Sequence, residues 1–427
     1  MLLALLFAST LTLNQAWEQA AHTNPTILET REYMREMDYA IEEARAQIFP
    51  KIDTQAVHSG NLNPGFLNSK DFEKILEEFP FEYQPEANYL YDLSLTLSQD
   101  LYTGGSIRTG LQAAQLAREV ALTRARRASN EVYRDIAEAY TNLFLARESR
   151  RVHETNLEQQ KVFLDQVRLR YDVGDATQLE LLQARVALSS VYPELYHDDE
   201  QIALHEGKLR ELLGEDPEFN PVLEELPHLE IRPAIEDLIP YALEHHPDVL
   251  ELKQAIEETE LREYLAASEA KPQASVRGGY GYSVSDLSNL GDPLYKAWNF
   301  EVRISLSLFD GFDRKYRKLQ QASRRDQLAY RLEASKIRID TTLTSLIKRL
   351  KALEEQLDAN QTFHQQAQEA LRTAEENFSL GAVTQLEVLD AQRQERQAQL
   401  SVLQSRFNVF MTRVTLLFEA GVPLYEE

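Results

Sequence analysis

Residues Tyr171 to Ala184 read YDVGDATQLELLQA, and residues Phe378 to Ala391 read FSLGAVTQLEVLDA. Half of the positions are identical, and in both copies a glycine precedes a Thr-Gln-Leu-Glu run. Glycine readily takes the left-handed backbone conformation in which many helices end, and threonine followed three residues later by glutamate is typical of a helix start. The sequence therefore predicts two copies of one helical hairpin.

The duplication extends well beyond these two turns. The offset that places Gly174 on Gly381 continues without a gap from Leu101/Leu308 to Gly214/Gly421. Such internal similarity indicates two copies of one structural unit. We expect a first repeat over 11–214, with a helix, a β-hairpin over 52–101 and a long helical hairpin over 106–213; a linker over 215–234; and a second repeat over 235–427, with a helix, a β-hairpin over 274–309 and a long helical hairpin over 314–419.

The long helices are predicted from composition and spacing. The stretch 106–170 contains no proline and a single glycine, and 314–377 contains neither. At 1.5 Å per residue each stretch predicts a helix of roughly 100 Å. A helix of that length is stable only when it packs along its whole length. We expect the two shorter helical segments of a repeat to stack end to end beside its long helix.

A short strand-like run covers 52–60, and three further stretches, 91–98, 274–283 and 299–308, alternate between apolar and polar residues with the period of a β-strand. Four strands cannot close a sheet, whereas three chains would supply twelve. Alternation with a polar face and aromatic residues at strand ends is typical of an outer-membrane barrel. The residues expected to face lipid are Leu93, Leu95, Leu97, Val302, Ile304 and Leu306.

Composition excludes several classes of function. With 69 acidic and 45 basic residues the net charge is −24, which makes nucleic acid an unfavourable partner. There is no cysteine, so the chain has neither disulfides nor thiolate metal sites. The sequence contains no phosphate-binding glycine loop, nucleophile elbow or metal-ligand signature. We therefore predict that the chain is not an enzyme and uses no cofactor or metal.

The N-terminal residues MLLALLFAST are apolar but too short to span a bilayer. They resemble the end of a secretory signal, so we interpret residues 1–10 as its remnant, with a short buried segment as the alternative. No run of eighteen apolar residues occurs in the sequence, so it does not predict a membrane-spanning helix.

The order of these features resembles the TolC family of outer-membrane efflux proteins. The likeness covers nearly the whole chain and rests on Leu-Thr-Leu-x-x-Ala-Trp at 11–17, Asn24-Pro25, the strand-to-helix turns at 101–105 and 308–312, and the paired hairpins. The resemblance implies a mixed, mainly α fold. Long antiparallel helical hairpins would form a periplasmic α-barrel, and four β-strands per chain would contribute to a trimeric 12-stranded transmembrane β-barrel, with the linker in an equatorial region.

The resemblance also implies partners and a location. The chain would act as a homotrimer in outer-membrane lipid, extend into the periplasm, and serve a periplasmic adaptor protein together with an inner-membrane pump or ABC exporter. It places the adaptor at the hairpin tips, which match Val173, Gly174, Asp175, Leu380, Gly381 and Ala382.

The periplasmic gate of the family matches Glu180, Glu387 and Asp390. Threefold symmetry would gather six carboxylates from Glu387 and Asp390, which would raise some of their pKa values and attract cations. Phe378 and Val383 stand where some family members have a tyrosine and an arginine, and neither side chain can form the corresponding polar contacts. We therefore expect a cation-selective gate held closed mainly by packing.

A second interpretation stays open at this point. The chain could be a periplasmic coiled-coil structural or adaptor protein whose strands form a small soluble sheet. That protein would be extracted without detergent as a monomer or dimer, whereas the channel would require detergent and would be a trimer.

Overall fold

The computed structural model of the chain describes residues 10–61, 88–214, 222–223, 229 and 231–425. The helices are α1 (Leu13–Thr23), α2 (Pro25–Ala46), α4 (Ser106–Asp172), α5 (Gln178–Ser189), α6 (Val191–Leu213), α7 (Ile235–His245), α8 (Pro247–Ser268), α9 (Asp313–Ser379) and α10 (Gln385–Glu419). The strands are β1 (Thr10–Leu11), β2 (Lys51–Asn61), β3 (Asn88–Tyr102), β4 (Val222–Leu223), β5 (Gln273–Val284) and β6 (Lys296–Ser305). Two short 3-10 helices, η2 (Leu287–Asn289) and η3 (Pro293–Tyr295), lie between β5 and β6.

The chain divides into two compact units, and both repeats contribute segments to each. The first unit comprises 1–35, 119–254 and 329–427, and the second comprises 36–118 and 255–328. The second unit contains the strands β2, β3, β5 and β6, and the first contains both helical hairpin tips.

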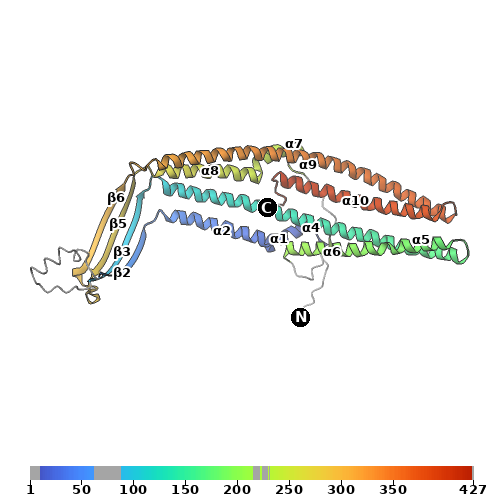
Figure 1. Cartoon of the computed structure of the whole chain (residues 1–427), viewed down its shortest axis with the longest axis horizontal. Helices are drawn as coiled ribbons and strands as arrows, with labels where there is room; N and C mark the ends of the chain where they lie inside the picture. Colours follow the sequence, from blue (N-terminus) through green and yellow to red (C-terminus); the bar gives the residue numbers. More distant parts are fainter. Residues whose placement is uncertain (1–9, 62–87, 215–221, 224–228, 230, 426–427) are drawn as a thin grey trace, which may run out of the picture. The chain divides into compact units, whose positions relative to one another are not determined.

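In the second unit these four strands form one antiparallel sheet in the order β2-β3-β5-β6 (Figure 1). Each predicted β-hairpin is present, and the pairing of β3 with β5 joins them. Glycine is required where β5 pairs with β3, because a Cβ on Gly281 would lie 2.3 Å from the carbonyl oxygen of Leu93. The last strand lies three residues earlier in the chain than the predicted stretch 299–308: β6 runs from Lys296 to Ser305, so Leu306 lies outside the sheet.

The predicted long helices are confirmed, because α4 and α9 each contain 67 residues. The return segment of the first helical hairpin, which was expected over 106–213, is divided into two helices: α5 ends at Ser189 and α6 begins at Val191. Pro193 lacks an amide hydrogen, and its ring would clash with the carbonyl group of Ser189 in an unbroken helix. The helix expected at the start of the second repeat is likewise divided, at His246-Pro247.

The shorter helices meet end to end, as expected. In the first repeat the C-terminus of α6 meets the N-terminus of α2, where Asn24 Nδ2 donates to the carbonyl oxygen of Leu212 at 3.0 Å and Thr23 Oγ1 to that of Leu213 at 2.6 Å. In the second repeat the end of α10 meets the junction of α7 and α8. The contact there is close, since a Cβ on Gly421 would lie 2.8 Å from His246 Cα.

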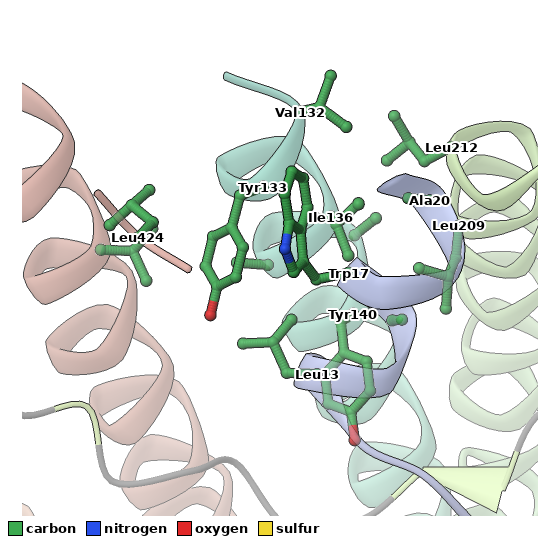
Figure 2. Close-up of a cluster of buried hydrophobic side chains, with 14 of the residues drawn as sticks. Leu13, Trp17, Ala20, Val132, Tyr133, Ile136, Tyr140, Leu209, Leu212 and Leu424 are labelled. Atoms are coloured by element: carbon green, nitrogen blue, oxygen red, sulfur yellow. The ribbon is translucent and has the colours of Figure 1, made fainter. Parts of the chain in front are cut away.

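An aromatic cluster forms the centre of the first unit (Figure 2). Trp17 of α1 stacks on Tyr425 with ring centroids 4.5 Å apart and contacts Tyr133 of α4 at 5.6 Å. Tyr140 is fully buried, and its hydroxyl donates to the carbonyl oxygen of Leu11 at 2.7 Å. Buried leucines from α1 and α6 fill the space around these rings. Leu13, Ala16 and Trp17 of the Leu-Thr-Leu-x-x-Ala-Trp run therefore belong to the hydrophobic core.

The predicted signal remnant lies outside the described residues except for its last position. Thr10 belongs to β1, which pairs in parallel with β4, Thr10 opposite Val222 and Leu11 opposite Leu223. Residues 215–221, 224–228 and 230 of the predicted linker also lie outside the description.

Candidate functional site

The two hairpin tips have the same local construction. Asp175 N donates to the carbonyl oxygen of Arg170 at 2.8 Å, and Ala382 N donates to that of Asn377 at 2.9 Å. Gly174 and Gly381 have φ values of 89° and 70°. A Cβ at either glycine would meet nothing within 4 Å, so the backbone conformation, and not lack of space, favours glycine.

All six residues predicted to form the docking tips are exposed. Val173 is 74% exposed and Leu380 is 80% exposed, although both are apolar. Each tip therefore presents an uncovered apolar side chain beside its glycine.

Glu180 and Glu387 complete the capping boxes at the N-termini of α5 and α10, the helices that follow the tips. A carboxylate oxygen of Glu180 accepts hydrogen bonds from Thr177 N at 2.6 Å and Thr177 Oγ1 at 2.8 Å. Glu387 accepts the same pair from Thr384, at 2.6 and 2.9 Å. These hydrogen bonds, the backbone amide's above all, lower the pKa of both carboxyl groups.

Asp390 lies one turn beyond Glu387 but has different partners. Its carboxylate accepts from Arg393 Nη2 at 2.5 Å and from Gln394 Nε2 at 2.6 Å. The Arg393 contact is the main reason that the pKa of Asp390 is lowered. Arg393 was not among the residues predicted from the sequence, although three residues is an ordinary spacing for paired side chains on a helix.

The lowered pKa values contrast with the rise expected from crowding. That rise requires three copies around one axis and stays a prediction, whereas the single chain favours the charged form of all three acids. The carboxylates of Glu387 and Asp390 have different hydrogen-bond partners. Glu387 accepts from Thr384, before it in the chain, and Asp390 accepts from Arg393, after it.

A hydrophobic cluster supports the tips from behind. Phe163, Val167, Leu181 and Val388 are buried there, with Phe378 and Val383 packed against them. Phe378 makes two contacts with α4: its ring lies 5.7 Å from that of Phe163, and the guanidinium carbon of Arg170 lies 4.9 Å from its centroid. In place of a hydroxyl contact, the Phe378 ring offers a face to a cation.

Polar contacts also join the two hairpins. Gln385 Nε2 donates to the carbonyl oxygen of Glu180 at 2.9 Å, and Gln160 Nε2 donates to Gln392 Oε1 at 2.9 Å. All three glutamines are buried. The sequence marks Gln385 only as a position that the repeat shares with Gln178. Gln178 is exposed, so the repeat does not predict that Gln385 is buried. Buried hydrogen bonds, which were not predicted from the sequence, therefore add to the apolar packing between the two hairpins.

A groove of about 1010 Å³ runs between the hairpins near their tips. Its apolar lining includes Val162, Phe163 and Phe378, and it extends to Leu380 and Gly381 of the second tip. Polar residues of α4 and α9, together with Gln392 of α10 and Asp175 of the first tip, contribute most of the remaining wall. The groove thus continues the exposed apolar surface of the tip into the space between the hairpins.

The capping acids give a testable pH dependence. A carboxyl group whose folded-state pKa is lowered stabilises the protein at neutral pH, and this contribution disappears as the pH falls below about 4. We expect Glu387→Gln, which can still accept the cap hydrogen bonds, to lower the unfolding temperature at pH 7 and to differ less from wild type at pH 3. Thermal unfolding followed by circular dichroism measures both values. The exposed Glu29→Gln is the control, and an equal pH profile for both variants would contradict the assignment.

The sheet exposes its apolar face. In β3, Leu93, Leu95 and Leu97 are exposed, whereas the alternating polar residues are partly covered. The register places Leu95 opposite Tyr280 and Tyr280 opposite Trp298, which is 79% exposed. Val302 and Ile304 share this face and are also exposed. A water-soluble sheet normally exposes the polar face instead.

The opposite face of the sheet is polar. Arg277 lies between Ser98 and Glu301 in the register, and Ser275 lies opposite Arg303. These residues border a hollow of about 240 Å³. This face is therefore suited to water.

Two features are absent from the described part of the chain. No helix there combines the length and the apolar character needed to cross a membrane. Nor does that part contain a group of three or more histidine, cysteine, aspartate or glutamate side chains able to hold a metal ion.

An antiparallel sheet with an exposed apolar face, together with two long helical hairpins, defines the outer-membrane efflux class of fold. Residues 16–215 and 238–421 match the family described as "Outer membrane efflux protein", and the chain belongs to that family. The predicted resemblance to TolC-type proteins, the outer-membrane location and the non-enzymatic character are thereby confirmed. The alternative of a periplasmic adaptor with a soluble sheet is set aside.

Named relatives and solved structures agree with this assignment. The cation efflux system protein CusC of Escherichia coli O157:H7 is 24% identical over 92% of this chain and 84% of its own length. The probable efflux pump outer membrane protein TtgC of Pseudomonas putida is 23% identical over 90% and 77%. A crystal structure of CusC has a TM-score of 0.80 at 18% identity and covers 96% of this chain and 92% of its own. That of VceC from Vibrio cholerae has a TM-score of 0.77 at 20% identity and covers 96% of both.

Proposed function

We propose that three copies of this chain form an outer-membrane channel-tunnel that conducts substrates received from an inner-membrane pump or ABC exporter through a periplasmic adaptor. The observation that carries the proposal is the sheet, whose apolar face is exposed and whose outer strands have free edges within the described residues.

The sheet edges favour three copies. β2 and β6 each have one neighbour in the sheet order. Inside a bilayer an unpaired edge leaves backbone groups without hydrogen bonds at a cost of several kcal/mol per group. Pairing β6 of one copy with β2 of the next removes every edge, and twelve strands in total make a barrel of a size known for outer-membrane proteins.

The helices of the first unit support a ring of copies independently of the sheet. Hydrogen bonds and ion pairs place them in the order α6, α4, α10, α9, as Figure 1 also shows. The two outer members have uncovered apolar residues, among them Leu182, Val186 and Tyr196 on α5 and α6 and Tyr330 and Ile337 on α9. These two surfaces differ, so copies that pair through them associate head to tail, which is the type of contact from which rings of identical subunits are built.

The hairpin tips are the proposed adaptor site. Their exposed Val173 and Leu380 continue into the apolar groove between the hairpins. An exposed apolar surface that connects to a groove is suited to a protein partner. The relatives are named for efflux of cations, antibiotics and toluene, so compounds of all three kinds belong in the test.

Bulky substitutions at the tips test the docking site. We expect Asp175→Trp and Ala382→Trp to leave the trimer intact, because both side chains are exposed. Each should weaken adaptor binding by roughly tenfold, which corresponds to about 1.4 kcal/mol. The readouts are the mass of the detergent-solubilised protein, adaptor affinity by calorimetry, and survival of a sensitised host on metal salts, antibiotics and toluene.

The matched control is Glu29→Trp, at an exposed helical position away from the tips. Normal trimers that still bind adaptor and export after both tip substitutions would exclude the tips as the docking site. A wild-type protein that is extracted as a monomer without detergent would overturn the channel itself.

A further inference from the structure

The helix that follows the first junction of each repeat, α2 or α8, begins in the same way but with a different capping residue. Asn24-Pro25 stands before α2 and His246-Pro247 before α8. Both capping residues have an extended backbone, with φ values of −67° and −60°. Asn24 Oδ1 accepts from Thr26 N at 2.9 Å. His246 Nδ1 accepts from Asp248 N at 3.0 Å. Each side chain therefore caps the N-terminus of the helix that follows it.

The two caps differ in their response to protons. An asparagine side chain does not titrate, whereas an imidazole nitrogen accepts a hydrogen bond only while it has no proton. The bond from Asp248 N to His246 Nδ1 therefore requires the neutral ring. A proton on Nδ1 would face the amide hydrogen of Asp248, and the cap of α8 would be lost. The cap of α2 would be unaffected by the same change in pH.

The surroundings of His246 favour its neutral form. The carboxylate of Asp248 accepts from Arg127 Nη1 of α4 at 2.7 Å and from Arg338 Nη2 of α9. Burial is the largest cause of the lowered pKa of His246; Asp248 opposes this effect, and the two guanidinium groups add to it. The other titratable groups around the junction are Glu131 of α4, His245 of α7, Glu251 of α8 and Glu419 of α10.

The first turn of α8 is also part of the contact with the end of α10. Val249, in this turn, is fully buried in one hydrophobic cluster with Leu416 and Ala420. The backbone of His246 and Pro247 packs closely on Gly421. Opening of the first turn of α8 would therefore loosen the end of α10 as well.

We propose that His246 makes the junction of α7 and α8 labile to acid, so that the second repeat loosens at a pH at which the first stays closed. A basic group whose folded-state pKa is lowered stabilises the fold fully above its unfolded-state pKa, which is about 6.5 for histidine. That stabilisation is lost as the pH falls below this value, because the open junction then binds a proton that the closed one resists. The acid lability is a property of a single copy and does not depend on what the chain transports.

Hydrogen exchange of backbone amides tests the acid lability in the full chain in detergent. Mass spectrometry measures the exchange at pH 7.5 and pH 5, with the intrinsic effect of pH on exchange removed. We expect the protection of the amides over 248–250 to fall by roughly tenfold between these two values. The amides over 26–28, after the asparagine cap, are the internal control and should keep their protection. Equal losses at the two junctions would contradict the role of His246.

Two substitutions remove the proton sensitivity and keep a cap. His246→Asn copies the first junction, and His246→Asp supplies a carboxylate that stays charged down to about pH 4. Both variants should keep their protection over 248–250 at pH 5. His245→Asn is the matched control and should respond as wild type does, because the ring of His245 contacts the carbonyl oxygen of Tyr241 and caps no helix.

A wild-type loss of protection in both His246 variants would overturn the proposal, as would wild-type protein whose protection over 248–250 does not change with pH. Failure of both variants to accumulate would also overturn it, because asparagine and aspartate are preferred residues at this position of a helix.

Discussion

Arginine at Leu95 is expected to destabilise the membrane-inserted protein by about 2 to 4 kcal/mol and to deplete the trimer from the outer membrane. Leu95 is the central residue of β3 and lies on the exposed apolar face beside Tyr280. In the proposed barrel this face meets hydrocarbon, where a guanidinium group loses its hydration. Urea titration of the protein folded into lipid vesicles measures the free energy, and heat-modifiable gel mobility measures the amount of trimer.

Neighbouring positions provide matched controls. Ser94→Arg places the same charge on the opposite, polar face and should cost much less. Leu306→Arg should also be mild, since the structure ends β6 one residue earlier. Equal losses at Leu95 and Ser94 would show that neither face meets lipid and would contradict the barrel.

Removing the acids of the proposed gate is expected to weaken the block of the channel current by multivalent cations by roughly tenfold or more. Three copies would place six carboxylates from Glu387 and Asp390 around one axis, and clustered charge of one sign concentrates the opposite ion. Multivalent cations added from the periplasmic side should therefore block the wild-type current in planar bilayers. Glu387→Gln with Asp390→Asn should relieve that block without opening the helix start, because a glutamine side chain at the third helical position can also accept the cap hydrogen bond of α10.

Substitution of Arg393 provides a variant with the opposite expected effect on the block. Its guanidinium neutralises part of the charge of Asp390. Arg393→Gln should therefore strengthen the block, in the direction opposite to removal of the acids. A block that is unchanged in both variants would move the constriction away from this turn of α10.

The local features of this chain could be predicted because they depend on neighbours in sequence. Gly174, Gly381 and the two capping boxes appear where the repeated stretch predicted them. Strand alternation predicted which residues share a face, since side chains in a strand alternate strictly. Arg393 lay within the reach of the same reasoning, three residues beyond Asp390.

Only the tertiary structure decided which distant segments meet. Nothing periodic in the sequence specifies that β3 pairs with β5, that Gln160 bonds Gln392, or that Arg170 lies over Phe378. Such contacts depend on the complementarity of two surfaces far apart in the chain, and alternation or helical spacing describes one surface at a time. The duplicated sequence determined that there are two similar hairpins, whereas the ion pairs that distinguish them, Arg147 with Glu206 and Glu354 with Arg413, became visible only once each long helix lay beside its partner.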